Sequence, residues 1–76
     1  MLQWYAVRTQ AHAEQKAAWH LRNQGFLTYL PCYLKRVRHA RRVSERPRPL
    51  FPRYLFLAMD IATARWRAIR STIGVI

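Results

Sequence analysis

The most constraining feature of this sequence is one uninterrupted strand-forming stretch that follows three closely spaced prolines. Pro47, Pro49 and Pro52 fix φ and lack a backbone donor, so this approach is extended but does not lie inside a sheet. No turn residue interrupts the chain from Arg53 to Met59, which predicts a strand there. Side chains alternate from one face of a strand to the other, and here both faces are apolar.

The two faces of this strand carry different side chains. Tyr54, Phe56 and Ala58 share one face, which is largely aromatic. Leu55 and Leu57 lie on the other face. A chain of 76 residues has few helices with which to cover both faces. We therefore expect an external partner to cover one of them.

The balance of charge points to an anionic partner. Fourteen Lys and Arg residues against three Asp and Glu residues give a formal net charge of +11. Such an excess destabilises a compact state by self-repulsion, and the predominance of Arg suits the recognition of phosphates and bases. Nucleic acid is the expected class of partner.

The same composition argues against several classes of protein. Cys32 is the only cysteine, so no internal disulfide or cysteine-based metal site is expected, which favours a reducing cytoplasm. No apolar run approaches the ~18 residues that span a bilayer. No histidine has a carboxylate or thiol partner at a catalytic spacing, and there is no glycine-rich phosphate loop. We expect a soluble, non-enzymatic protein without a metal or cofactor.

The remaining segments predict an α+β fold in the order β-α-β-β-α. Beyond the strand already described, the pattern predicts strands over residues 2–9 and 26–30 and helices over residues 11–24 and from an N-cap at Asp60 to Ile73. In the first helix, small residues and Leu21 form the buried side and Trp19 is exposed. In the second helix, Trp66 should pack against the sheet.

Residues 33–48 form a basic segment with seven cations and one acid, Glu45. A projecting two-stranded arm with its tip near His39-Ala40 and a disordered loop are both compatible with this composition. The candidate phosphate contacts in this arm are Arg36, Arg38, Arg41 and Arg42, and the alternative is a solvated charged loop.

A second candidate nucleic-acid contact is the edge of the first helix. Lys16, His20 and Gln24 follow one another at intervals of four residues and so form a stripe. The alternative for this stripe is a simple solvent-exposed edge. For Tyr54 and Phe56 the alternative is ordinary core packing, but with Trp4 on the same sheet face they would form an aromatic hot spot for a protein partner.

The sequence resembles the N-terminal domain of the NusG family of transcription elongation factors, most closely the RfaH-like branch. The segments that carry this resemblance are Trp4-Tyr5-Ala6-Val7, Gly25-Phe26, Tyr29-Leu30-Pro31, Pro49-Leu50-Phe51-Pro52-Arg53-Tyr54-Leu55-Phe56 and Ser71-Thr72-x-Gly74-Val75. The resemblance runs through the whole chain.

The resemblance implies a four-stranded antiparallel sheet with helices, of which residues 1–76 hold three strands and two helices. The fourth strand and the KOW domain that follows it in the family are absent, so the chain is interpreted as a partial domain. Its exposed sheet edge would favour self-association.

The resemblance also implies binding sites. The clamp helices of the largest catalytic subunit of RNA polymerase would dock on an apolar patch that comprises Trp4, Phe51, Tyr54 and Phe56. Non-template or upstream DNA would contact Lys16, His20, Gln24 and Thr72. The implied function is a cytoplasmic, nucleoid-associated bacterial elongation and antitermination factor that favours processive transcription. The alternative is a small RNA- or ribosome-binding module that uses the basic arm and the aromatic sheet face.

Overall fold

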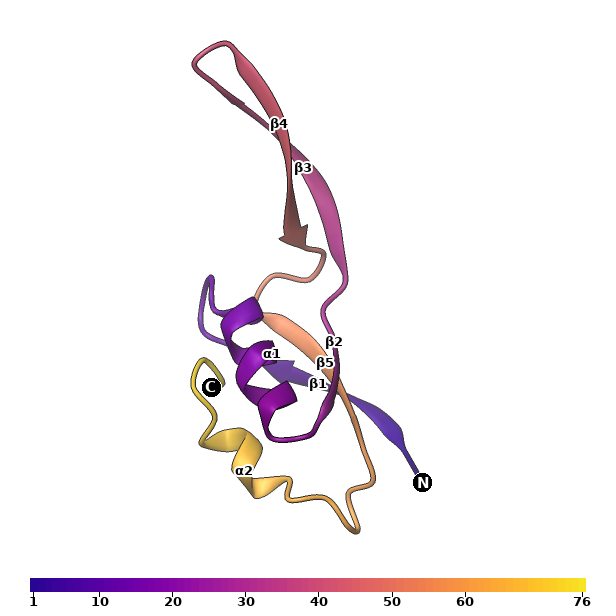
Figure 1. The fold of residues 1–76 in the computed structure, drawn as a ribbon. Coiled ribbons are helices and arrows are strands. Elements are labelled where there is room, and N and C mark those ends of the chain that lie inside the picture. The colour runs from indigo at the N-terminus through magenta and orange to yellow at the C-terminus, as the bar shows by residue number, and fades with distance from the viewer.

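A three-stranded antiparallel sheet with helices on one face forms the body of the protein, and a long two-stranded arm projects from it (Figure 1). This computed structural model describes the whole chain, Met1 to Ile76. The elements in chain order are β1 (Gln3–Arg8), α1 (Glu14–Asn23), β2 (Leu27–Tyr29), β3 (Cys32–His39), β4 (Arg42–Pro49), β5 (Tyr54–Met59) and α2 (Arg67–Arg70). The predicted α+β class is confirmed.

The predicted central strand is β5, which lies between β1 and β2 in the sheet order β1-β5-β2. β1 pairs with it antiparallel, with Trp4 opposite Ala58. β2 pairs with its other edge, with Tyr29 opposite Phe56. Residues directly opposite one another share a face, so this register brings Trp4, Tyr29 and Phe56 to the same side of the sheet.

The core lies between the other side of the sheet and α1. Leu21 of α1 and Leu55 and Leu57 of β5 are all completely buried there. Burying a leucine side chain stabilises a fold by about 1.5–3 kcal/mol. Ala17 and Ala18 are also buried, and their small side chains let α1 approach the sheet closely. Trp19, as predicted, lies on the exposed side of α1.

The basic segment forms a two-stranded hairpin, so of the two alternatives that its composition allowed, the projecting arm is found and the disordered loop is not. β3 and β4 pair antiparallel from Cys32 opposite Pro49 to His39 opposite Arg42. The two residues between the strands, Ala40 and Arg41, have φ angles of 48° and 68°. Positive φ at both central residues is typical of the primed turns that fit the twist of a hairpin. The hairpin makes the molecule elongated, with extents of 52 × 22 × 17 Å.

The first helix is shorter than predicted because its N-terminal residues adopt another conformation. The pattern predicted a helix over residues 11–24, whereas α1 begins at Glu14. His12 has a φ of 62°, which is left-handed and incompatible with an α-helix. At the other end, Gly25 has a φ of 94° and ends the helix as predicted.

The long second helix predicted from Asp60 to Ile73 is wrong. The carboxylate of Asp60 accepts a hydrogen bond from the backbone N–H of Ala62 at 3.0 Å, as an N-cap does, but only a single turn follows it before the chain leaves helical geometry. α2 contains only Arg67–Arg70, so the expected apolar stripe is broken. Trp66, predicted to be buried, is 39% exposed, and its ring centroid lies 5.4 Å from the guanidinium carbon of Arg67.

The last residues of the chain lie along the outer edge of β1. Val75 forms an antiparallel bridge with Thr9. The backbone N–H of Ile76 donates a hydrogen bond to the carbonyl oxygen of Arg8 at 3.0 Å. Val75 and Ile76 thus begin a strand-like pairing at this edge. Neither helix is long and apolar enough to cross a membrane.

Candidate protein and nucleic-acid interfaces

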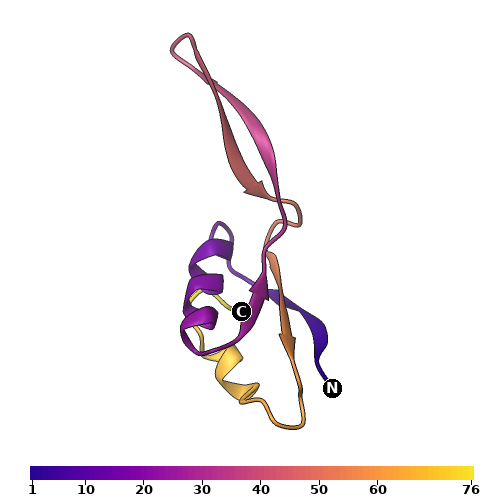
Figure 2. The same ribbon diagram turned by 45° about the vertical axis from the view of Figure 1, so that its right-hand side comes forward.

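One face of the three-stranded sheet carries large apolar side chains that no helix covers. Figure 2 shows α1 and α2 on the same side of the sheet, which leaves the other side open. Trp4 and Tyr29 on this open face are 56% and 58% exposed. Exposed aromatic side chains that lie next to one another mark an interaction site more reliably than isolated ones.

The open face contains a shallow apolar groove of about 430 Å³. The residues that line it come from β1, β2, β5 and the segments on either side of the arm, and they are Trp4, Tyr29, Pro31, Leu50, Phe51 and Phe56. Trp4 and Tyr29 meet edge to face with ring centroids 6.4 Å apart. Phe51 and Phe56 meet in the same way at 5.8 Å. The groove can accept apolar side chains of a partner between two fixed pairs of rings.

Hydrogen bonds to the body hold the segment that supplies Phe51. The backbone N–H of Arg53 donates to the carboxylate of Glu14 at 2.8 Å. The carbonyl oxygen of Arg53 accepts from the N–H of Thr9 at 2.7 Å. On the arm side, the N–H of Leu50 donates to the carbonyl oxygen of Pro31 at 2.8 Å. These hydrogen bonds tie down the backbone on both sides of Phe51.

The structure brings together three of the four residues predicted to bind polymerase. Trp4, Phe51 and Phe56 all line the groove, whereas Tyr54 does not. Tyr54 is 41% exposed and shares the face with Phe56 because the two lie two residues apart on β5. Their predicted role in binding remains a prediction.

Sequence reasoning missed Tyr29, Leu50 and Pro31 as members of this groove. The alternation of β2 could have placed Tyr29 on one of two faces, and only the register that pairs it with Phe56 decides which. Pro31 and Leu50 lie outside the sheet, at the base of the arm. They reach the groove because β3 and β4 pair and bring both ends of the arm together.

The predicted stripe on α1 divides into an accessible and an engaged part. Lys16 is exposed, and the ring of His20 packs edge to face against Trp19 with centroids 4.9 Å apart. Gln24 instead donates from Nε2 to the hydroxyl oxygen of Thr72 at 2.8 Å. Gln24 is nevertheless exposed and His20 is half-buried, so all three residues of the stripe can still be reached from solvent, with the exposed Trp19 beside them.

Thr72, the fourth predicted nucleic-acid contact near this helix, is 6% exposed. Its hydroxyl donates to the carbonyl oxygen of Ala68 at 2.8 Å and accepts from Gln24. Both bonds lie within the protein, so in this conformation the hydroxyl joins α1 to α2 and is not presented to solvent.

The four predicted phosphate contacts of the arm are all exposed, but they do not form one cluster. Arg36 and Arg38 lie two residues apart on β3 and so share a face of the hairpin. Arg42 pairs with His39, which places it on the opposite face, and Arg41 lies in the turn. The single salt bridge of the protein joins the amino group of Met1 to Asp60, so no cation of the arm forms a salt bridge.

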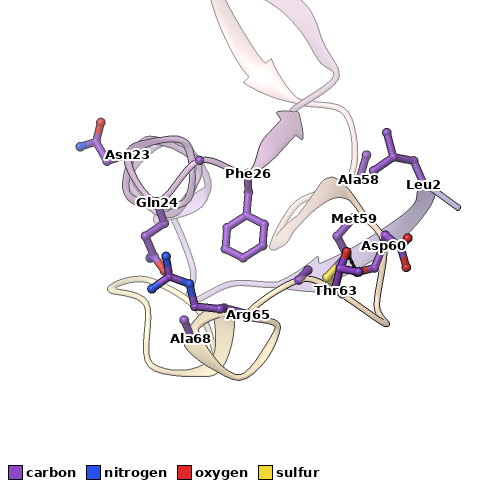
Figure 3. Close-up of a pocket in the computed structure, with 12 residues that line it drawn as sticks. Leu2, Asn23, Gln24, Phe26, Ala58, Met59, Asp60, Thr63, Arg65 and Ala68 are labelled. Atoms are coloured by element: carbon purple, nitrogen blue, oxygen red, sulfur yellow. Dashed lines mark hydrogen bonds between the residues drawn. The ribbon is translucent and has the colours of Figure 1, made fainter.

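A larger cavity of about 620 Å³ lies between the end of α1, the end of β5 and the turn before α2. Figure 3 shows Phe26 pointing into it, with Gln24 and Arg65 to one side and Asp60 and Leu2 to the other. Gln24 is the only predicted site residue that lines it.

The amine of Met1 and the N–H of Ala62 hold the pKa of the Asp60 carboxyl below its ordinary value. No three potential metal ligands come together anywhere in the protein.

The comparison with protein families covers almost the whole chain. The family model NusG, described as transcription termination factor nusG, matches residues 2–76. No curated protein matches the chain significantly. The matched range includes the open sheet face, the stripe on α1 and the arm.

Proposed function

This chain belongs to the NusG family of transcription factors, and from that premise we propose that it acts as an elongation factor domain of the RfaH-like branch. In this proposal the open sheet face binds the clamp helices of the largest catalytic subunit of RNA polymerase. The basic residues contact DNA of the same complex. The protein performs no chemistry of its own and works in the cytoplasm.

The observation that carries this proposal is the apolar groove on the face of the sheet that no helix covers. A partner helix about 10–12 Å across presents apolar side chains along one stripe, which suits a groove bounded by rings. The two ring pairs give the central, water-excluding anchors from which hot spots are built. Because the groove is fixed by backbone hydrogen bonds, little ordering free energy is lost when a helix docks.

The second contact follows from the charge of the chain. Lys16 and His20 lie on the exposed side of α1, and the arm carries unpaired cations far from the body. A factor that holds the polymerase clamp at one surface and DNA at another resists opening of the clamp, which favours processive elongation. The gain in overall affinity comes from linking two binding sites in one molecule rather than from one tight contact.

The geometry of the rings favours a protein partner over the alternative, a single-stranded RNA. Bases stack on exposed aromatic faces. In the groove, however, Trp4 and Tyr29 meet at an interplanar angle of 68° and Phe51 and Phe56 at 86°. Each pair thus directs the edge of one ring at the face of the other, so the rings do not form one flat platform for successive bases.

The experiment that tests the proposal is direct binding to purified RNA polymerase in the absence of nucleic acid. The double substitution Phe51→Ala with Phe56→Ala removes one ring pair and should weaken binding at least ~30-fold, which corresponds to one hot spot of about 2 kcal/mol. Trp19→Ala is the matched control because Trp19 is an aromatic residue about as exposed as Phe51 but lies on α1.

Two results would contradict this proposal. Undiminished affinity of the double variant would remove the groove as the docking site, provided that its circular dichroism spectrum matches that of the unmodified chain. Loss of affinity in Trp19→Ala with retention in the double variant would place the interface on the helical side. Binding of single-stranded RNA that depends on both Phe56 and the basic arm, without binding to polymerase, would support the RNA-binding alternative.

A further inference from the structure

The register of the arm sorts its side chains onto two faces. Residues directly opposite in an antiparallel pair point to the same side, and successive residues point to opposite sides. Lys35 pairs with Arg46, and Tyr33 pairs with Arg48. We call their side the cationic face, and its polar and aromatic members are Tyr33, Lys35, His39, Arg42, Ser44, Arg46 and Arg48.

The other side of the hairpin has a different chemistry. Arg36 pairs with Glu45, the only acid of the arm, and Arg38 pairs with Val43. We call this side the mixed face, and its principal members are Leu34, Arg36, Arg38, Val43, Glu45 and Pro47. It carries two cations and one acid, whereas the cationic face carries four cations and no acid. The excess positive charge of the arm is therefore concentrated on one side.

The cationic face is unfavourable for the free hairpin. Lys35 and Arg46 lie directly opposite one another, and like charges in this position destabilise an antiparallel pair. Arg48 is the next residue along β4 on the same face, about 7 Å further on by the rise of a strand. No acid of the protein forms a salt bridge with any of these residues. An anionic partner laid along this face would remove the repulsion as it binds.

From this asymmetry we propose that the arm binds the sugar–phosphate backbone of a double-stranded nucleic acid through its cationic face alone. The inference rests on the proposed function and assigns one side of the arm to it. Arg42 to Arg48 span about 20 Å along β4, a little over half a turn of B-form DNA. The major groove also admits a two-stranded ribbon. Arg36 and Arg38, which sequence reasoning selected, lie on the side turned away from the phosphates.

The chemistry of the cationic face favours a duplex over a single strand. Proteins that bind single strands combine positive charge with several aromatic rings on which successive bases stack. The cationic face carries one tyrosine, Tyr33, at the base of the hairpin, and His39 near the tip. It contains point charges for phosphates and lacks a continuous stacking surface.

The test compares two double variants that remove the same number of charges from neighbouring positions of the hairpin. Lys35→Gln with Arg46→Gln neutralises the cationic face, and Arg36→Gln with Arg38→Gln neutralises the mixed face. Binding of the intact chain to a fluorescent DNA duplex is measured by anisotropy over a range of salt concentrations. Each phosphate contact adds about 0.9 to the slope of log affinity against log salt, so the first variant should flatten the slope by about 1.8. The second should leave the slope nearly unchanged.

The possible outcomes separate cleanly. Equal flattening of the salt slope in both variants would overturn the inference, because net charge alone would then decide binding. A larger flattening in the mixed-face variant would also overturn it. A single strand that binds as tightly as the duplex, with the same dependence on Lys35 and Arg46, would overturn the assignment to a duplex. An RNA duplex tested in parallel shows whether the backbone of DNA or of RNA is preferred, and a dependence on the cationic face with either one supports the inference.

A second measurement guards against misfolding and separates this inference from the proposed function. Removing the Lys35–Arg46 repulsion should slow hydrogen exchange of the hairpin amides in the free protein, whereas a misfolded arm would exchange faster. Both variants retain the apolar groove, so their affinity for polymerase without nucleic acid should match that of the unmodified chain. If the slopes fail to separate while polymerase binding persists, the assignment of the face fails and the proposed function stands.

Discussion

The carboxylate of Glu14 accepts a hydrogen bond from the backbone N–H of Arg53 at a distance of 2.8 Å, which joins the first residue of α1 to the residue that precedes β5. The side chain of Glu14 is only 6% exposed. Arg53 has a φ of 71°, a left-handed conformation that its side chain disfavours. This buried acid thus holds the loop that presents Phe51 to the groove.

Replacing Glu14 tests how much this contact contributes. Glu14→Ala leaves the partly buried N–H of Arg53 without an acceptor, so the free energy of unfolding should fall by about 1–3 kcal/mol. Glu14→Gln keeps an acceptor oxygen of nearly the same reach and should lose less. Urea unfolding followed by circular dichroism measures both. Equal stability of Glu14→Ala and the unmodified chain would show that solvent satisfies the Arg53 N–H equally well.

A second contact between distant segments depends on the absence of a side chain. Gly74 has a φ of 90°, and a Cβ there would lie 3.1 Å from the Cβ of Ala17 and 3.3 Å from the carbonyl oxygen of Ala13. Gly74→Ala should therefore combine a left-handed strain of about 1–2 kcal/mol with the cost of overpacking against α1, about 1–3 kcal/mol.

Gly25→Ala is the matched control for this prediction. Gly25 has a similar φ of 94°, but nothing lies within 4 Å of a Cβ built there. Gly25→Ala should show the conformational cost alone, so its thermal midpoint should fall less than that of Gly74→Ala. Equal midpoints for the two variants would mean that α1 moves aside without loss.

The parts of the fold that the sequence predicted well are those that local pattern controls. β5 lacks any turn residue over its whole length, and its alternation correctly separated Leu55 and Leu57, which are buried, from Phe56, which lies on the open face. The exposed position of Trp19 followed from the helical period in the same way. Such features can be predicted from the residues of one element alone, without knowing which segments pack against it.

The parts that were wrong or missed depend on contacts between distant segments. The apolar period of residues 62–73 fits a helix, but only one turn follows Asp60, whose carboxylate is bound by the distant amine of Met1 at 2.8 Å, before α2 begins at Arg67. Tyr29 enters the groove through a register that alternation does not define. The division of the arm into two faces follows from pairing Lys35 with Arg46, which charge counting does not reveal.

Asp60 gives the stability of the protein a defined dependence on pH. The hydrogen bond from the Met1 amine, followed by that from the Ala62 N–H, lowers the pKa of this carboxyl below its ordinary value of 3.8. A carboxyl whose pKa is lower in the folded state stabilises the fold above its unfolded pKa, and this contribution disappears as the pH falls through the folded value. The melting temperature should therefore fall in acid, below the ordinary pKa of Asp.

Asp60→Asn should remove this part of the acid dependence and flatten the profile of melting temperature against pH. Glu45→Gln is the control, because Glu45 lies exposed on the arm and has no salt-bridge partner. A profile of Asp60→Asn that parallels that of the unmodified chain in acid would show that other carboxyls cause the loss of stability.

The difference between Tyr54 and Phe56 provides the sharpest prediction about the groove. Both rings stand on the open face of β5, but only Phe56 lines the groove, where it meets Phe51 with ring centroids 5.8 Å apart. Anchors in a desolvated pocket contribute most of the binding free energy, whereas residues around it contribute little. Phe56→Ala should therefore weaken binding to purified RNA polymerase about 10-fold or more beyond the effect of Tyr54→Ala. A larger effect of Tyr54→Ala would contradict this prediction. The partner would then contact the part of the sheet face near Arg8, which pairs with Tyr54, and the groove would lie at the rim of the interface.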